Sequence, residues 1–199
     1  MSAIRFYPAD APLPEGLHTD EFLLRPLRAT DCDLDYAAVM SSADLLLVKS
    51  LGRWPRPGFT WDENLKDLQE HEADHRARRA FTFTVMNPSE TECLGCVYLN
   101  PLRPALERYG ASEEQFATVG DDETGVHFWA RTSRLADDLD ARLFTALRDW
   151  LARDWAFRRA LFRANDGEER LLRIYAAVGL RPVYHLEVAD VPQTMLFFG

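Results

Sequence analysis

Between residues 125 and 187 the sequence alternates twice between a short apolar run and a long amphipathic stretch. The run "VHFWA" (126–130) precedes residues 138–155, whose apolar side chains recur at helical spacing. "RRALFRA" (158–164) precedes a second such stretch, which ends at Gly179, a residue type common at helix C-termini. Two successive strand–helix–strand passages favour parallel strand pairing and therefore an α/β domain.

The remainder of the sequence predicts the other elements of a mixed sheet. We expect a strand over 22–28, a helix over 29–47, a loop over 50–59 and a second helix over 60–79. A hairpin over 80–100, a long polar connection over 101–123 and a closing hairpin over 182–198 complete the sheet. Thr60 and Glu63 have capping-box spacing. The fold class is α/β: one domain over 22–199 with a mixed, twisted β-sheet flanked by helices, after an irregular lead-in over 1–21.

Charge and composition restrict the partners. The net charge of −9 argues against nucleic acid and against an anionic membrane, because both require a basic surface. The sequence has no apolar run long enough for a membrane span, and the N-terminus does not read as a signal peptide. Three cysteines are too few for a disulfide framework, so we expect a reducing cytoplasm. The aromatic content leaves a homodimer open.

The string "HEADH" (71–75) fits the H-E-x-x-H pattern of zinc hydrolases. On a helix it would place His71 and His75 one turn apart, with Glu72 as the general base. The surrounding residues are mostly charged, and the sequence offers no clear third ligand. We therefore favour a solvated helix face, expect no metal site, and keep the zinc hydrolase as a distant alternative.

Cys93 and Cys96 form a C-x-x-C pair within a predicted strand. Residues three apart in a regular strand point to opposite faces, so we expect two separate core cysteines. A redox pair would place its first cysteine at a helix N-terminus, and a zinc site would need a second pair of ligands.

Three segments together resemble the GNAT superfamily of N-acetyltransferases. They are "FLLRPLRATDCDLDYAAVM", "FTFTVMNPSETECLGCVYLNP" and "RIYAAVGLRPV", and the similarity extends over residues 22–198. The resemblance implies transfer of an acetyl group from acetyl-CoA to a small-molecule or peptide amine. It also implies a central strand that splays from its neighbour, with backbone N–H groups available to the thioester carbonyl.

The resemblance also implies which residues form the cofactor site. The acetyl group would lie beside Phe128, Trp129 and Ala130, and the following loop and helix start would hold the diphosphate. An asparagine that precedes the last helix often contacts the cofactor in this family. The candidate cofactor-binding residues are Phe128, Trp129, Ala130, Arg131, Arg134, Ala136, Asp138, Leu139, Asp140, Ala141 and Asn165.

The transfer chemistry requires a base for the amine and an acid for the leaving thiolate. By resemblance the acid is Tyr175 on the last helix, although Tyr175 also shares an apolar stripe that is typical of a core residue. His127 and Glu123, near the central strand, are the candidate bases. By strand alternation, His127 should point to the face opposite Phe128.

The diphosphate loop departs from the family pattern, since Asp138 and Asp140 stand where the family has glycines. Acetyl-CoA binding would require these carboxylates to turn outward. Alternatively, Asp137 or Asp138 caps the following helix and Asp140 complements its dipole. The sequence therefore leaves two main hypotheses: an N-acetyltransferase with a divergent cofactor loop, and a catalytically silent GNAT-like binding protein.

Overall fold

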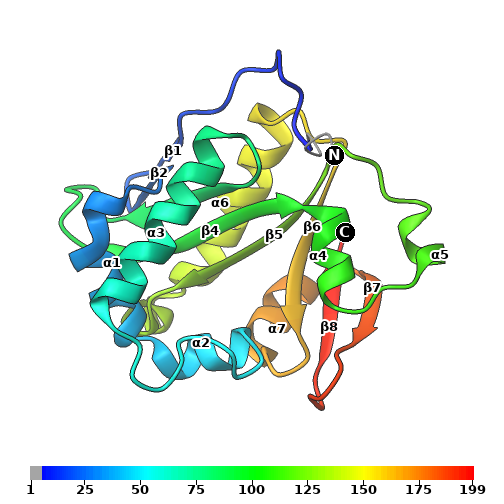
Figure 1. The fold of residues 1–199 in the computed structure, drawn as a ribbon. Helices are drawn as coiled ribbons and strands as arrows, with labels where there is room; N and C mark the ends of the chain where they lie inside the picture. Colours follow the sequence, from blue (N-terminus) through cyan, green and yellow to red (C-terminus); the bar gives the residue numbers. More distant parts are fainter. Residues whose placement is uncertain (1–5) are drawn as a thin grey trace.

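An eight-stranded mixed sheet organises residues 6–199, the part of the chain that the computed structural model describes (Figure 1). The strand order is β1-β2-β3-β4-β5-β6-β8-β7, and only the β5–β6 pair is parallel. The architecture confirms the predicted α/β fold class. The strands are β1 (Leu17–His18), β2 (Leu23–Pro26), β3 (Phe81–Met86), β4 (Cys93–Pro101), β5 (Glu123–Ala130), β6 (Arg159–Asn165), β7 (Pro182–Glu187) and β8 (Thr194–Phe198).

Helices cover both faces of the sheet (Figure 1). Helices α1, α3 and α4 pack on one face, whereas α6 and α7 bury their apolar stripes on the other, against an aromatic-rich core. The α-helices are α1 (Cys32–Met40), α2 (Ala43–Lys49), α3 (Trp61–Arg76), α4 (Leu102–Arg108), α5 (Glu113–Phe116), α6 (Leu139–Asp154) and α7 (Glu169–Ala177), and the 3-10 helices are η1 (Ala29–Asp31) and η2 (Thr132–Asp137).

The two parallel strands separate halfway along their length. The β5–β6 register runs from the Glu123–Arg159 pair to the Val126–Phe162 pair and stops there. Beyond this point β5 continues to Ala130 paired only with β4, and β6 continues paired only with β8. The predicted splay of the central strands is therefore present.

A β-bulge on β4 changes where its cysteines point. Cys93 pairs with Met86 and Gly95 pairs with Val85, so Leu94 is an extra residue on β4. As a result Cys93 and Cys96 both face the core beneath α1. The expectation of opposite faces was wrong, because strand alternation applies only to a strand without a bulge.

Two predicted segments contain more structure than expected. The single helix predicted over 29–47 is η1, α1 and α2, with the break between α1 and α2 at Ser41, whose hydroxyl donates to the Ala38 carbonyl. The connection over 101–123 contains α4, which buries Leu102 and Leu106 one turn apart. Neither feature has a strong local signal, and both depend on packing against the sheet.

Other local predictions are confirmed. Thr60 accepts from the Glu63 N–H while the Glu63 carboxylate accepts from the Thr60 N–H, which is the predicted capping box of α3. Within the predicted lead-in, Leu17–His18 forms the edge strand β1, and residues 1–5 lie outside the described part. None of the helices in the described part could cross a membrane, since each lacks the necessary length or apolar character.

Candidate functional site

The splay opens a cleft between β5 and the start of α7, which we call the β5–α7 cleft. It has a volume of about 340 Å³ and an apolar floor formed by β5. Its wall comes from α2, from the start of α6 and from the turn between β6 and α7. The lining residues are Leu45, Val48, Lys49, Phe128, Trp129, Ala130, Leu135, Asp140, Gly167, Glu168, Glu169, Arg170, Leu171 and Arg173.

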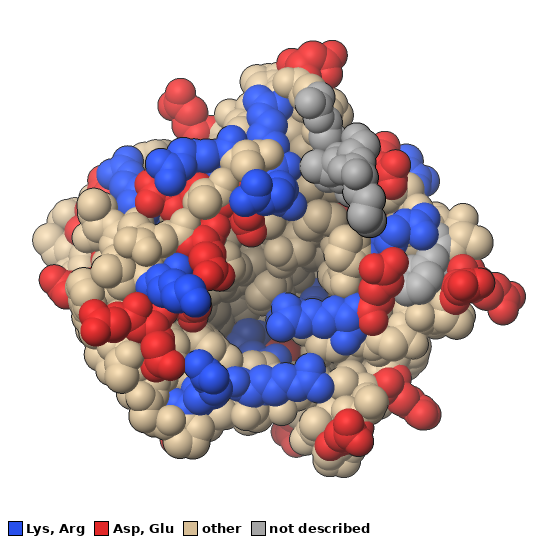
Figure 2. All heavy atoms as spheres, viewed as in Figure 1, with Lys and Arg blue, Asp and Glu red and all other residues tan. Residues whose placement is uncertain are grey.

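A larger cleft lies on the opposite face of the sheet, between α3 and α4, and we call it the α3–α4 cleft. Its volume is about 690 Å³. Figure 2 shows this face of the molecule hollowed at its centre, with Lys and Arg side chains along the lower margin of the hollow. The lining residues are Leu27, Asp35, Ser50, Arg53, Trp54, Asn64, Asp67, Leu68, His71, Tyr98, Asn100, Pro101, Pro104, Ala105, Arg108, Tyr109, His127 and Arg163.

Strand β5 contributes to both clefts at the point of the splay. Phe128 lines the β5–α7 cleft and His127 lines the α3–α4 cleft, in agreement with strand alternation. The His127 ring stacks on Tyr98 with centroids 4.4 Å apart. Burial lowers the pKa of His127 well below its usual value, and the positive charges of Arg163 and Lys49 lower it further. His127 is therefore a neutral imidazole at pH 7, able to accept a proton.

The start of α6 holds two carboxylates that one arginine binds together. Arg170, from the first turn of α7, donates to both Asp140 oxygens at 2.7 and 2.8 Å and to Asp138 at 2.8 Å. These hydrogen bonds raise the pKa of the Arg170 guanidinium above its usual value. Asp140 is buried and lines the β5–α7 cleft, whereas Asp138 is exposed.

The structure assigns the aspartates a different role from helix capping. Asp138 is the N-cap residue of α6, but its side chain makes no cap hydrogen bond, and its backbone is left-handed at φ 55°. The predicted side-chain cap at Asp138 is therefore absent, because the carboxylate turns toward Arg170 instead. Asp140 lies in the first turn, where a negative charge complements the helix dipole.

The other cations of the β5–α7 cleft are also paired with carboxylates. Lys49 forms a buried ion pair with Glu168, and Arg173 lies 3.7 Å from Glu169. The Lys49 ammonium also lies 6.0 Å from the centroid of the Phe128 ring. A phosphate entering this cleft would therefore have to compete with carboxylates for each cation.

Tyr175 lies in the core and lines neither cleft. Its ring packs against Phe144 and Phe198, with centroids 4.8 and 5.1 Å away. Its hydroxyl donates weakly to the Arg163 carbonyl at 3.5 Å. Burial raises the pKa of the Tyr175 phenol well above its usual value, and the Glu168 charge raises it further. The predicted acid thus occupies the position expected of a core tyrosine.

The remaining predicted cofactor residues do not line the β5–α7 cleft. The Asn165 amide donates to the Val48 carbonyl at 2.9 Å and accepts from Gly167 N–H, so it joins α2 to the turn before α7. Arg131 and Arg134 both pair with Glu92. The others lie in η2 or in the first turn of α6: Ala136, Leu139 and Ala141.

Glu123, the second candidate base, lies at the end of β5 away from the splay. It is fully buried and forms ion pairs with Arg158 and Arg159. Two guanidinium groups hold this buried carboxylate in place. Glu123 therefore joins β5 to β6 and lines neither cleft.

The "HEADH" side chains are engaged with the sheet. His75 Nδ1 lies 3.2 Å from the Thr82 carbonyl oxygen, and His71 Nδ1 lies 3.3 Å from the Thr82 hydroxyl. Glu72 accepts from the Ala29 N–H at 3.3 Å. Within residues 6–199, no third potential ligand joins the two histidines.

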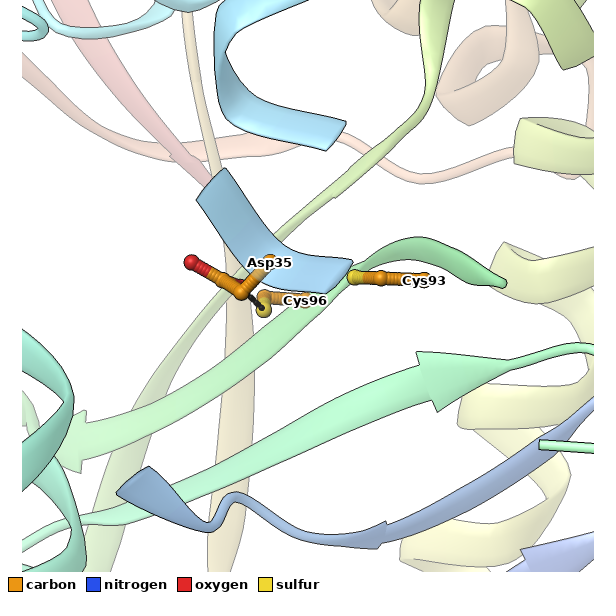
Figure 3. A group of neighbouring side chains, drawn as sticks. All are labelled: Asp35, Cys93 and Cys96. Atoms are coloured by element: carbon orange, nitrogen blue, oxygen red, sulfur yellow. Dashed lines mark hydrogen bonds between the residues drawn. The ribbon is translucent and has the colours of Figure 1, made fainter. Parts of the chain in front are cut away.

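A different group of potential ligands lies beneath α1 (Figure 3). Asp35, Cys93 and Cys96 are buried and have ligand atoms within 4.8 Å of one another. Asp35 already accepts from the Asn64 amide at 2.9 Å and from the Cys96 thiol at 3.5 Å. Burial raises the pKa of the Asp35 carboxyl. The group is a hydrogen-bonded polar cluster in the core.

Sequence reasoning missed most of the residues that line the β5–α7 cleft, among them Lys49, Glu168 and Arg170. Glu168 and Arg170 belong to "NDGEER", which begins at the predicted site residue Asn165. Their position at the start of the last helix could have indicated that they lie near the site. Lys49 had no such signal, because it reaches Glu168 from α2, across 119 residues of chain.

Comparison with known proteins places the fold. No family model and no curated protein matches this sequence. Ribosomal-protein-S5-alanine acetyltransferase from Vibrio fischeri has a TM-score of 0.66 at 14% identity, with 92% of this chain and 94% of that chain covered. The ribosomal L7/L12 acetyltransferase RimL, in complex with coenzyme A, gives a TM-score of 0.68 at 13% identity over 91% and 94%.

A third solved structure is the microcin C7 self-immunity acetyltransferase MccE, in complex with acetyl-CoA and AMP. Its TM-score is 0.68 at 11% identity, with coverage of 94% of this chain and 96% of that chain. At 11–14% sequence identity the similarity is one of fold, and it extends over more than nine tenths of each chain. This chain therefore has the fold of the GNAT acetyltransferases.

Proposed function

We propose that the protein is an N-acetyltransferase that moves the acetyl group of acetyl-CoA to an amine. The observation that carries this proposal is the splay of β5 from β6 after Val126. At this point one face of β5 lines the β5–α7 cleft and the other face lines the α3–α4 cleft. Phe128 faces one cleft and His127 the other, so a donor and an acceptor would meet at this strand. The coenzyme A and acetyl-CoA complexes among structures of this fold support the choice of donor.

The acyl end of the donor fits the splay. Acetyl-CoA, when bound, supplies the acyl group as a thioester beside Phe128, Trp129 and Ala130. Residues 127–130 have no β6 partner, so their backbone N–H groups on that side can donate to the carbonyl oxygen as negative charge develops on it. Such donors are already oriented by the β4–β5 pairing, so little reorganisation is required.

The diphosphate of acetyl-CoA fits only if Arg170 releases Asp138 and Asp140. In any α-helix the first N–H groups have no partner within the helix, and at α6 they are the natural diphosphate site. Asp138 and Asp140 lie beside them, held by Arg170. We propose that the donor binds when Arg170 turns from the carboxylates toward the diphosphate, an exchange that weakens cofactor affinity.

His127 is the base in this proposal. It lines the α3–α4 cleft beside the splay and is neutral at pH 7. As the amine nitrogen forms its bond to the acyl carbon, it becomes an ammonium whose proton His127 would accept. The acyl carbon–sulfur bond breaks, and coenzyme A would leave as a thiolate that takes its proton from solvent. Glu123 is too far along β5 from the splay to take this role, because it belongs to the part of the strand paired with β6.

A second candidate function is a binding protein that keeps the fold but transfers no acetyl group. Two observations favour it: Tyr175 is buried away from the cleft, and Arg170 is held by Asp138 and Asp140. In this case the α3–α4 cleft would bind a ligand without a donor on the other face of the sheet.

Calorimetry and a transfer assay distinguish the two functions. For an acetyltransferase we expect heat of acetyl-CoA binding at millimolar concentration or below, and thiol release in the presence of an amine panel. His127→Gln should lower the release rate, whereas His185→Gln, at an exposed histidine on β7, should not. Absence of acetyl-CoA binding at millimolar concentration would leave the binding protein as the function.

The acceptor is a small-molecule or peptide amine in this proposal. Two of the similar structures are named as acetyltransferases of ribosomal proteins, so peptides with a free N-terminus belong in the amine panel. We propose a cytoplasmic location, where acetyl-CoA is available and the three buried cysteines stay reduced. We also propose a homodimer, which solution scattering would test by measuring the molecular mass.

A further inference from the structure

The α3–α4 cleft differs from the β5–α7 cleft in how its cations are balanced. Most arginines elsewhere in the described part are held by carboxylates or backbone carbonyls. Arg53, Arg108 and Arg163 line the α3–α4 cleft, and among residues 6–199 none has a carboxylate within ion-pair distance. In a chain of net charge −9, three unpaired guanidinium groups around one cleft are a distinctive arrangement.

Arg163 is the most fixed of the three. It follows Phe162, the last β6 residue paired with β5, so it lies at the splay. One of its Nη atoms donates to the Tyr109 hydroxyl at 2.7 Å, and its guanidinium lies 5.4 Å from the centroid of the Tyr109 ring. Tyr109 is buried and orients the guanidinium. A half-buried guanidinium retains donors for an anion, and its planar fork suits a carboxylate or a phosphate.

The charges of the α3–α4 cleft are separated between its walls. Asp67 belongs to α3, on the acidic wall, whereas Asp35, on α1, is already held by Asn64 and Cys96. Arg108 and Arg163 belong to α4 and β6, on the basic wall. His127 lies on the floor between them, on β5. A ligand that carries both an amine and an anion can therefore satisfy both walls.

We propose that the α3–α4 cleft binds its acceptor through an anionic group, a carboxylate or a phosphate, held by Arg163 and Arg108 with Arg53 near the margin. The acceptor is then a small amine that bears an anion. The inference rests on the proposed function, because it treats this cleft as the acceptor side. The cleft volume of about 690 Å³ is within the range of small-molecule sites.

The first test measures binding without acetyl-CoA. Calorimetry compares O-phosphoethanolamine and 4-aminobutyrate with ethanolamine, which has the amine but no anion. We expect both anionic amines to bind at least tenfold more tightly than ethanolamine, and binding to weaken as salt is added. The tighter of the two distinguishes a phosphate from a carboxylate acceptor. Equal affinity for all three amines would overturn the proposal.

Matched arginine variants locate the subsite. Arg163→Gln should weaken binding of the anionic amines roughly 10- to 100-fold, while ethanolamine binding stays unchanged. Arg148→Gln, at an exposed arginine on α6, should change neither. Arg108→Gln, at an exposed position of α4, keeps the test available if the Arg163 variant fails to fold. Anion binding that survives both cleft variants would contradict the assignment.

A transfer assay separates this inference from the proposed function. Arg163-dependent binding of an anionic amine that is never acetylated supports the anion subsite and contradicts the acetyltransferase. Acetylation of ethanolamine and O-phosphoethanolamine with equal kcat/KM has the opposite meaning: it supports the acetyltransferase and contradicts the subsite. Preferential, Arg163-dependent acetylation of the anionic amine supports both.

Discussion

At the scale of single residues, cofactor affinity depends on the charges at the start of α6. Each pair of like charges about 5 Å apart, one on a carboxylate and one on the diphosphate, costs on the order of 1–3 kcal/mol at an effective dielectric of 20 to 80. We expect the double variant Asp138→Gly/Asp140→Gly to bind acetyl-CoA roughly 10- to 100-fold more tightly than the unchanged chain. Glycine also suits position 138, whose φ is 55°. Calorimetry at fixed ionic strength measures the change.

Two further variants control that experiment. Arg170→Gln leaves both aspartates without their partner, so it should weaken acetyl-CoA binding instead of strengthening it. Asp154→Asn removes one negative charge at the far end of α6, where salt screens it, and should have no effect. If the double glycine variant bound no more tightly than the unchanged chain, the carboxylates would not be what limits the site.

The proposed base predicts a pH dependence of acetyl transfer. His127 must be neutral to accept a proton, and its pKa is lowered well below the usual 6.5. On acidification from pH 8, the rate attributable to the base should therefore hold through pH 6.5 and fall only as the pH passes the lowered pKa. Arg163→Gln removes a positive charge that lowers this pKa, so the acid limb should move to higher pH.

A pre-steady-state assay at saturating substrate concentrations measures the rate of acetyl transfer as a function of pH in the unchanged chain and in the variants. His127→Gln should reduce the rate by roughly 10²- to 10⁴-fold and abolish the acid limb. A limb of the same position in the His127→Gln variant would show that another group titrates.

At the scale of elements, the bulge on β4 fixes the strand that lines both clefts. Gly95 has φ 151°, and a Cβ there would collide with the Trp129 carbonyl on β5. We expect Gly95→Ala to destabilise the fold by about 2–4 kcal/mol, through backbone strain plus the contact. Gly52→Ala is the matched control: Gly52 also has positive φ, at 77°, but open space around it, so the cost should be about 1 kcal/mol. Urea unfolding measures both.

The elements themselves could largely be predicted from the sequence, because their signals are local. The capping box at Thr60, the hairpins and the order of strands and helices follow from residues close in the chain. Of the two parallel pairings expected from the strand–helix–strand passages, only β5–β6 forms, because β8 lies between β6 and β7. The bulge could not be predicted: it depends on the pairing of Leu94 and Gly95 with β3, which single-strand periodicity does not contain. The helix α4 was missed because its stability comes from packing Leu102 against the sheet.

The site was less predictable than the fold for the same physical reason. Strand alternation placed His127 and Phe128 correctly on opposite faces. Ion pairs between distant segments have no sequence period, so neither the Arg170–Asp140 pair nor the Lys49–Glu168 pair could be anticipated. These pairs decide the charge balance of the β5–α7 cleft.

At the scale of the whole molecule, the surface charge and the cleft charges oppose each other. The net charge of −9 repels anions at long range, and this repulsion is screened beyond about 8 Å at physiological salt. Inside the α3–α4 cleft the unpaired arginines act within that distance. Recognition of an anionic acceptor therefore depends on charges inside the cleft. The net charge of the protein should lower the association rate of such an acceptor more than it lowers the affinity.

Three half-buried histidines predict how the stability of the whole fold depends on pH. Burial lowers the pKa of His71, His75 and His127 in the folded state. The unfolded chain then binds more protons from about pH 6.5 down to each lowered pKa, so the free energy of unfolding falls on acidification through that interval. Each histidine contributes up to about 1.4 kcal/mol per pH unit. Asp35, whose pKa burial raises, contributes with the opposite sign.

Urea unfolding at pH 7.5, 6.5, 6.0 and 5.5 tests this dependence. We expect stability to be flat above pH 6.5 and to fall below it. His75→Gln removes one titrating group from the side of α3 that contacts the sheet, at a residue that lines neither cleft, so it should reduce the slope below pH 6.5 whatever its effect at pH 7.5. Asp35→Asn removes the opposing contribution and should steepen the slope. If the Asp35→Asn variant instead became more stable between pH 6.5 and 5.5, the imidazoles would be taking up protons in the folded state without loss of stability. That result would contradict the neutral state assigned to His127.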